Sequence, residues 1–306
     1  MISSTARAAA LFVAVGVAAA CSSPSAPSTA APSSEASPSV ASSPVPTTGG
    51  RPPGLPTPQH VLVVVFENHA LDSVLGSPDA PYLTALAASG TTLTDAHGVR
   101  HPSQPNYLAL FSGSTQGVSG DSCPHSFSTP NLGSQLLAAG RTFAGYSEGL
   151  PAAGAADCTA GEYARKHNPW VDFPALPAAV NQPLSALPTD FATLPTVSFV
   201  IPNMCSDMHD CSVATGDTWA EENLAAFVAW GRTHDSLLVV TFDEDDNSSD
   251  NHIATFLVGP MVRAGTSTQR TDHYRVLRTI EAMYGLPPLG AAGGTTPLAG
   301  IWTIGP

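Results

Sequence analysis

The sequence predicts an α/β fold in which one mostly parallel sheet is covered by helices on both faces. Short apolar runs rich in β-branched residues recur along the chain, as in strands that are buried on both sides. Segments with helical spacing and helix stop signals alternate with these runs, and such alternation favours parallel strands. The chain has 306 residues, 43% of them hydrophobic, so one large domain can bury a core of its own.

The predicted strands are recognised by uninterrupted apolar character. Residues 60–66 (HVLVVVF) are the clearest, because a strand buried on both faces shows no alternation of polar and apolar side chains. The same character in shorter runs predicts strands at 142–146, 196–201, 237–242 and 253–258. Residues 148–195 are rich in Ala, Pro and Gly, and we expect irregular loops there with one or two short helices.

The predicted helices are bounded by capping residues, prolines and glycines. Residues 80–89 end before Gly90, and residues 131–139 begin with Asn131 as a cap and end before Gly140. Further helices are predicted from Asn106 onward after Pro105, at 218–230 with Asp217 near the start, and at 273–284.

The N-terminal part is predicted to direct export. Residues 8–20 are apolar, too short to span a bilayer, and typical of a signal peptide that covers 1–21. Small residues precede Cys21 as in a bacterial lipobox, although Ala18 stands where Leu is usual, so Cys21 is the expected lipidation site and membrane anchor. Residues 22–58 are rich in Ser, Pro and Ala and are expected to form a disordered tether before a folded domain at 59–306. The protein is therefore expected to be a cell-surface lipoprotein or secreted.

Four cysteines remain for the folded domain, and an even number in an exported chain indicates two disulfides. The pairing Cys205–Cys211 is favoured because its loop is short, and it leaves Cys123–Cys158. A structural zinc site is disfavoured because the sequence has no C-x-x-C pair.

The formal net charge of −13 limits the classes of partner that the protein is expected to bind. An acidic surface repels phosphate backbones, so no nucleic-acid partner is expected. An anionic substrate is still compatible with this charge, because a bound cation reverses the field locally.

Polar side chains follow three of the predicted strands at the point where each strand ends. They are Glu67, Asn68 and His69 after the first strand, Asp207 and His209 after strand 196–201, and Asp243 and Glu244 after strand 237–242. Function gathers at the carboxyl edge of open α/β sheets, and mixed carboxylate and imidazole groups suit a divalent cation. Each cluster alone could be a helix cap, a turn or a solvated loop, but their shared position favours one metal site.

The acidic run 241–252 (TFDEDDNSSDNH) also invites a calcium-loop interpretation. That interpretation fails, because Ser248 and Ala254 stand where an EF-hand needs Gly and Glu, and a strand precedes the run. Asp245, Asp246 and Asp250 are expected to face water or to orient the metal ligands.

Ser103 is the candidate nucleophile. It precedes Pro105, which suits the first turn of a helix, and helix N-termini favour anions. A serine beside a metal ion can lose its proton and attack phosphorus. The alternative is a serine that only caps the helix, and a Ser-His-Asp hydrolase is disfavoured because no G-x-S-x-G elbow occurs.

Five motifs in order resemble the bacterial phosphoesterase family of the alkaline phosphatase superfamily, which includes secreted acid phosphatases and phosphatidylcholine-type phospholipases C. They are ENH, HPSQPNYLALFSGS, PNMCSDMHDC, FDEDD with NHI, and DHYRVLRTIEAMYGL. The resemblance covers about residues 59–304 and implies a three-layer α/β/α sandwich that catalyses metal-dependent phosphoryl transfer.

The resemblance also implies roles for individual residues. Ser103 is the nucleophile that forms a phosphoserine, and His209 assists the phosphate or the leaving group. The implied metal ligands are Glu67, Asn68, Ser103, Asp243 and Glu244. The supporting or second-metal candidates are Asp207, His252 and His273, and the substrate-binding candidates are His101 and Asn106. The ion is calcium, magnesium, manganese, iron or zinc.

The expected activity is that of an exported phosphomonoesterase of the acid phosphatase type, with phosphoinositides among its candidate substrates. The substrate is a phosphate ester, either a small molecule or a lipid headgroup. A phospholipase C-type phosphodiesterase is the first alternative, disfavoured because the longer phospholipase relatives carry further C-terminal domains. The second alternative is a non-catalytic surface-anchored binding protein, disfavoured because Ser103 and the acidic ligands are all present.

Overall fold

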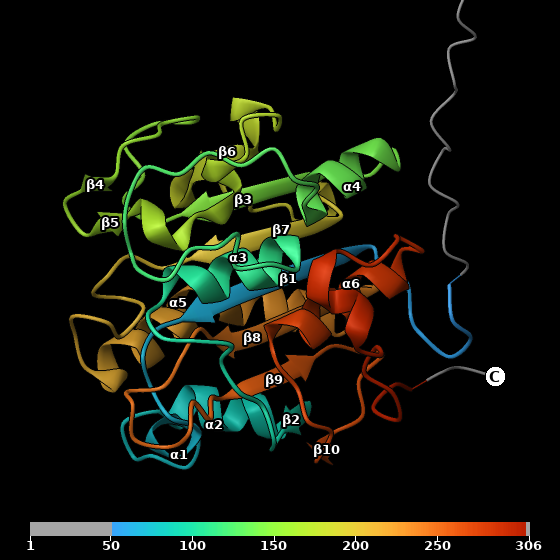
Figure 1. Cartoon of the computed structure of the whole chain (residues 1–306). Coiled ribbons are helices and arrows are strands. Elements are labelled where there is room, and N and C mark those ends of the chain that lie inside the picture. The colour runs from blue at the N-terminus through green and yellow to red at the C-terminus, as the bar shows by residue number, and fades with distance from the viewer. Residues whose placement is uncertain (1–50, 304–306) are drawn as a thin grey trace, which may run out of the picture. The chain divides into compact units, whose positions relative to one another are not determined.

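The computed structural model describes residues 51–303, which form one mostly parallel eight-stranded sheet with a small separate hairpin (Figure 1). The strand order is β10-β2-β9-β8-β1-β7-β3-β6. The signal peptide, Cys21 and the tether up to residue 50 lie outside the described residues. Within 51–303, no helix is both long enough and apolar enough to cross a membrane.

The centre of the sheet confirms the strands predicted from apolar runs. Its strands β1 (His60–Phe66), β7 (Val197–Ile201), β8 (Ser236–Phe242) and β3 (Phe143–Ser147) are parallel. Every residue of β1 and β8 is buried, as expected for strands covered on both faces. The carboxyl ends of these strands therefore meet at one edge of the sheet.

The outer strands were only partly predicted. Of these, β9 (Thr255–Val258) was expected, and it runs antiparallel to β8. Three strands of three residues each were missed because they carry no clear periodicity: β2 (Thr91–Leu93), β6 (Asn181–Pro183) and β10 (Gly265–Ser267). Strands this short take their shape from their sheet partners rather than from local sequence.

Helices cover the sheet on both faces, so the predicted three layers are confirmed. On one face α3 (Gln104–Ser112) packs against α6 (His273–Met283), and both lie in front of the sheet in Figure 1. On the other face α2 (Pro81–Ala88) packs against α5 (Val213–Gly231). The remaining helices are α4 (Leu132–Ala138), where Asn131 forms the expected cap, and the short α1 (Leu71–Val74).

The prediction for α5 was wrong at its start. The helix begins at Val213 and not at Thr218, because Ser212 accepts a hydrogen bond from the backbone of Thr215 and caps it. Asp217, which we took as a start signal, lies inside the helix. Its carboxylate instead accepts backbone hydrogen bonds from the first turn of α2.

The stretch 148–195 is more ordered than expected. It contains the hairpin β4 (Thr159–Ala160) and β5 (Tyr163–Ala164), together with strand β6. Five 3-10 helices also lie here: η1 (Arg165–His167), η2 (Pro169–Asp172), η3 (Ala178–Val180), η4 (Leu184–Ala186) and η5 (Phe191–Thr193). A further 3-10 helix, η6 (Gly290–Gly294), follows α6.

The folded domain begins slightly before the predicted start at Gln59. Leu55 is buried, and Pro58 accepts a hydrogen bond from Tyr284, so packing begins upstream of Gln59.

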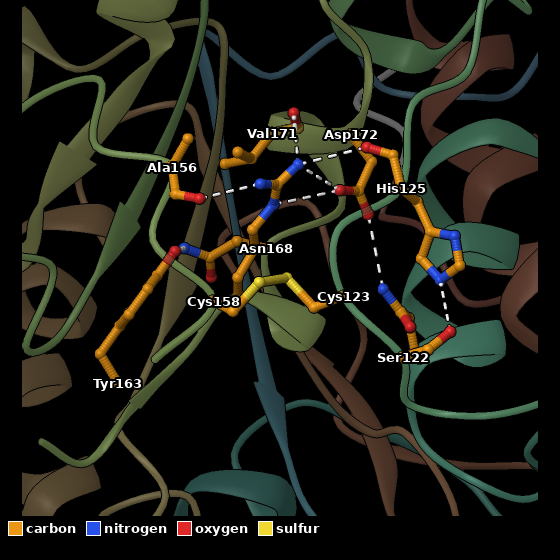
Figure 2. Close-up of a disulfide and its surroundings, with 11 residues drawn as sticks. Ser122, Cys123, His125, Ala156, Cys158, Tyr163, Asn168, Val171 and Asp172 are labelled. Atoms are coloured by element: carbon orange, nitrogen blue, oxygen red, sulfur yellow. Dashed lines mark hydrogen bonds and ion pairs between the residues drawn. A yellow bond between two sulfur atoms is a disulfide. The ribbon is translucent and has the colours of Figure 1, made fainter. Parts of the chain in front are cut away.

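Both predicted disulfides are confirmed. Cys123–Cys158 joins the loop after α3 to the hairpin β4–β5, with a sequence separation of 35 (Figure 2). Cys205–Cys211 closes a short loop after β7, with a separation of 6. Each bond therefore constrains a loop at the carboxyl edge of the sheet.

Candidate active site

Backbone hydrogen bonds tie together the segments that follow β1, β7 and β8. The backbone N–H of Glu67 donates to Asp207 O at 2.9 Å, and that of Asp243 donates to Phe66 O at 3.0 Å. The N–H of Asn68 donates to Asp243 Oδ1 at 3.2 Å. The structure thus brings the three polar clusters together at one edge of the sheet.

Ser103 lies at the centre of this edge. Its Oγ donates to Glu67 Oε2 at 2.8 Å and lies 3.4 Å from Glu244 Oε1 and 3.5 Å from Asn68 Oδ1. Ser103 occupies the N-cap position of α3, yet its side chain makes no capping hydrogen bond within the described part of the chain. The hydroxyl therefore faces the carboxylates, at the helix end where an anion is favoured.

Three buried carboxylates surround this hydroxyl, those of Glu67, Asp243 and Glu244. Burial and then the charge of Glu67 raise the pKa of Asp243 well above its usual range. The same two causes raise the pKa of Glu244 to about 8. Asp243 Oδ2 is buried without a hydrogen-bond partner among the described residues. Oxygen ligands with uncompensated negative charge fit a divalent cation, which would relieve the repulsion between them.

Asn68 completes this set through an unusual backbone conformation. Its φ of 50° lies in the left-handed region, which asparagine tolerates better than most residues. In the orientation that satisfies its hydrogen bonds, its amide nitrogen lies 3.2 Å from Glu244 Oε1 and 3.3 Å from Glu67 Oε2. This nitrogen is the Asn68 atom that lies 3.5 Å from Ser103 Oγ, and the amide must turn over before its oxygen can bind a cation shared with the carboxylates.

His167, from η1, was missed by the sequence analysis. It is buried between two carboxylates, with Nε2 3.2 Å from Glu67 Oε1 and Nδ1 3.3 Å from Asp207 Oδ2. Burial alone would lower the pKa of His167, but Glu67 and Asp207 raise it to about 9. Burial would likewise raise the pKa of Glu67, but His167 lowers it to about 2. Ligand atoms of these three residues lie within 4.8 Å of one another, so this second cluster could also hold a metal ion.

The rim of the site carries His209. Its Nδ1 lies 2.7 Å from Asp210 Oδ1, and its Nε2 lies 3.3 Å from Lys166 Nζ. Lys166 also pairs with Asp121 Oδ2 at 3.2 Å, and Asp121 Oδ1 accepts the backbone N–H of Gln104 at 2.9 Å. Asp121 therefore caps the helix that follows Ser103. An imidazole and an ammonium group therefore lie together, and Asp121 links the ammonium group to the start of α3.

The two substrate-binding candidates occupy different places. His101 Nδ1 lies 2.7 Å from Glu244 Oε2, and its side chain is one-third exposed at the site. Asn106 is buried and accepts hydrogen bonds from the backbone of Val99 and Arg100, at 2.8 and 3.0 Å. Asn106 therefore braces the loop that carries His101, and its amide is occupied by that loop.

The two remaining histidine candidates also differ. His273 is buried, and its Nε2 lies 3.0 Å from Phe242 O, at the end of β8 directly before Asp243. His252 Nε2 lies 3.0 Å from Thr94 O, and its ring stacks on His97. The polar contact of His252 within 51–303 is therefore with the loop near Thr94 and not with the carboxylates.

Comparison with known proteins identifies the family. The model of the Phosphoesterase family matches residues 77–287. The chain belongs to the phosphoesterase family, as its motifs predicted. Family members hydrolyse phosphate ester bonds, so this phosphoesterase is an enzyme.

Curated relatives of this phosphoesterase are phosphatases by name. It is 49% identical over 261 residues to the phosphatidylinositol-3-phosphatase of Mycobacterium tuberculosis, an alignment that covers 84% of this chain and 87% of that protein. It is 31% identical over 248 residues to a phosphate-repressible acid phosphatase of Penicillium chrysogenum. That alignment covers 74% of this chain and 57% of the fungal protein, so the chain spans little more than half of its length.

Solved structures place this phosphoesterase in the expected fold. A protein of the alkaline phosphatase superfamily from Vibrio parahaemolyticus matches with a TM-score of 0.52 and 13% identity, over 80% of this chain and 71% of that one. A phosphonate monoester hydrolase from Silicibacter pomeroyi matches with a TM-score of 0.55 and 13% identity, over 78% of this chain and 76% of that one. At such low identity the match concerns the fold alone.

Proposed function

We propose that this chain is an exported, metal-dependent phosphomonoesterase that uses Ser103 as its nucleophile. The observation that carries the proposal is the position of Ser103 Oγ, 2.8 Å from Glu67 Oε2 and surrounded by buried carboxylates at the carboxyl edge of the sheet. The relatives named as phosphatases favour a monoester substrate.

The proposed metal ligands are Glu67, Asn68, Ser103, Asp243 and Glu244. A divalent cation bound there supplies charge neutralisation to the phosphoryl oxygens and lowers the pKa of the serine hydroxyl. Calcium, magnesium, manganese, iron and zinc all accept oxygen ligands of this kind.

In the proposed reaction, Ser103 Oγ attacks phosphorus in line and forms the serine–phosphorus ester. The bond from phosphorus to the leaving oxygen breaks at the same time. The serine proton passes to one of the two carboxylates that face Oγ, Glu67 Oε2 at 2.8 Å or Glu244 Oε1 at 3.4 Å. His209 is the proposed proton donor to the leaving oxygen, and the contact of 2.7 Å between its Nδ1 and Asp210 Oδ1 orients the ring.

A water molecule then attacks the phosphoserine and releases phosphate. His209, having lost its proton, is placed to take a proton from this water. Before the attack, the hydrogen bond from Ser103 Oγ to Glu67 Oε2 holds the nucleophile in one orientation. As phosphate leaves, the proton that the carboxylate took from Ser103 returns to Oγ. Positioning and charge neutralisation supply most of the rate enhancement in such reactions.

The finer parts of the proposal concern substrate and location. The Mycobacterium tuberculosis relative is named for a phosphoinositide, so phosphoinositides are proposed substrates here. The phospholipase C alternative is weaker, because the relatives described above are named as phosphatases. A purely binding role is weaker still, since Ser103 and the acidic residues form one site.

The two disulfides support an oxidising compartment and hence export.

The decisive experiment replaces the nucleophile. We expect Ser103→Ala to lower turnover of p-nitrophenyl phosphate by at least about 1,000-fold while the melting temperature stays close to that of the wild type. Ser112→Ala, at the other end of α3, is the matched control and should retain activity. Intact mass after an acid quench should show a phosphorylated wild type and an unmodified Ser103→Ala protein.

Two results would change the proposal. Near-wild-type phosphatase activity in Ser103→Ala would remove the serine from the mechanism. A wild type that cleaves phosphatidylcholine but leaves p-nitrophenyl phosphate intact would favour the phospholipase alternative.

A further inference from the structure

A cavity of about 310 Å³ opens beside the rim of the active site. Its lining includes Asp121, Glu162, Lys166, Met204 and Asp210, together with the disulfide Cys123–Cys158. Small-molecule sites in proteins usually measure about 300–1,000 Å³. The volume is therefore enough for one ring-sized group and not for a long chain.

The cavity shares walls with the reacting centre. Lys166 Nζ lies 3.3 Å from His209 Nε2, and Asp210 Oδ1 lies 2.7 Å from His209 Nδ1. Asp121 binds the backbone N–H of the residue after Ser103. His209, the proposed proton donor, therefore contacts two residues of the cavity wall, Lys166 and Asp210.

The chemistry of the walls selects the leaving group. Carboxylates of Asp121, Glu162 and Asp210 are hydrogen-bond acceptors for hydroxyl groups. Met204 and the disulfide offer apolar surface to the C–H faces of a ring.

The cavity is also held in shape before any substrate arrives. Cys123–Cys158 joins the loop that carries Asp121 to the hairpin that carries Glu162 (Figure 2). Beside it, the buried Arg165 binds the carboxylate of Asp172 at 2.8 Å, along with the backbone oxygens of Ala156 and His125. A site whose walls are fixed in advance loses less entropy on binding.

We propose that this cavity, the leaving-group subsite, binds a polyhydroxylated ring, a sugar or a cyclitol, esterified to the phosphate that Ser103 attacks. The proposal rests on the proposed function and adds the residues that recognise the alcohol. Glu162 and Thr159 are its specificity residues, because they line the cavity and our mechanism gives them no part in the chemistry.

The test compares two phosphate esters of the same ring size, myo-inositol 1-phosphate and cyclohexyl phosphate. Their rings differ only in hydroxyl groups, so the ratio of their kcat/KM values depends on two things: how well the enzyme binds the hydroxyl groups, and how reactive each ester is by itself. The reactivity of the esters does not depend on the enzyme variant. A change in the ratio on mutation therefore measures a change in binding of the hydroxyl groups. We expect Glu162→Ala to lower the ratio of inositol to cyclohexyl ester about 10-fold, mainly through KM, and Thr159→Val to lower it less.

The matched control is Glu221→Ala, an exposed glutamate on α5 away from the subsite. It should leave the ratio within about 2-fold of the wild type, the scale expected for a surface substitution. An unchanged ratio in Glu162→Ala and Thr159→Val, in a protein that still hydrolyses p-nitrophenyl phosphate, would overturn the subsite and leave the proposed function standing. A wild type that hydrolyses none of the three esters would overturn both.

Discussion

Tyr107 donates its phenolic hydrogen to Oε1 of Glu67, the carboxylate whose other oxygen receives the hydroxyl of Ser103. The ring of Tyr107 also stacks on His167, with ring centroids 4.9 Å apart. Both oxygens of Glu67 are therefore held by fixed partners. This arrangement orients the Ser103 hydroxyl through the carboxylate and not through the backbone of α3.

Tyr107→Phe tests this orientation. We expect kcat to fall about 10-fold and the free energy of unfolding to fall by about 1–3 kcal/mol, because a buried carboxylate oxygen loses a donor. Steady-state kinetics and urea unfolding measure the two effects. Tyr284→Phe removes a similarly buried hydroxyl, bonded to Pro58 O, and should lower stability without changing kcat. A wild-type kcat in Tyr107→Phe would show that Glu67 does not need this support.

Asp243→Asn tests the cation site through stability instead of activity. In the presence of a chelator at pH 8, we expect this variant to be more stable than the wild type by roughly 1–3 kcal/mol, because it removes an uncompensated buried carboxylate. Added divalent ion should reverse the order, since an ion at 100 times its Kd stabilises the wild type by about 2.7 kcal/mol. Melting curves with each candidate ion provide the measurement.

The control for that experiment is Asp79→Asn, an exposed residue before α2 that should respond to the ion as the wild type does. Equal stabilisation of Asp243→Asn and the wild type by the ion would remove Asp243 from the ligand set.

The two disulfides should contribute differently. The chain-entropy model gives about 4 kcal/mol for a loop of 35 residues and about 2 kcal/mol for one of 6. We therefore expect Cys123→Ser/Cys158→Ser to lower the free energy of unfolding more than Cys205→Ser/Cys211→Ser. The loop closed by Cys205–Cys211 holds Asp207 and His209. Removing this disulfide should therefore lower kcat at least about 10-fold. Urea unfolding and p-nitrophenyl phosphate kinetics measure both, and the reverse order of stabilities would contradict the prediction.

The carboxyl edge could be predicted because it depends on local signals. The runs that became β1 and β8 are long and mostly apolar, and each ends one residue before a candidate ligand, Glu67 or Asp243. Strands buried on both faces are rarely mistaken, and parallel strands place their ends at one edge. The proximity of Glu67 and Asp243, which are far apart in the sequence, could therefore be predicted from the positions of the strand ends alone.

His167 could not be placed in this way. It lies in a segment without periodicity, whose path is fixed by Cys123–Cys158 and by the ion pair of Arg165 with Asp172. The one local signal was a basic and polar run, KHN, in a stretch otherwise dominated by Ala and Pro. For Asp245 the sequence left two positions open, and burial together with a contact of 3.4 Å with His101 places it beside the candidate ligands and not in water.

Glu281 gives a pH dependence that is separate from the proposed metal site. It is buried near the end of α6, where Oε1 accepts the backbone N–H of Leu289 at 2.8 Å, and Arg278 is 3.6 Å from Oε2. Burial raises the pKa of Glu281 from 4.5 to about 7, against the opposing effects of Leu289 and Arg278. The folded protein therefore binds more protons than the unfolded chain between these two values. The stability from this group is fully present below about pH 4.5 and is lost as the pH rises through about 7.

Glu281→Gln removes this titration and keeps an acceptor for Leu289. With a chelator present, we expect the wild type to lose roughly 2–3 kcal/mol relative to the variant between pH 5 and pH 8. The two proteins should be about equally stable at pH 5, and the variant should be the more stable at pH 8. Urea unfolding at intervals of half a pH unit gives the difference curve, in which all other titrating groups cancel. Parallel stability profiles would mean that Glu281 stays ionised in the fold and that Arg278 compensates its charge in full.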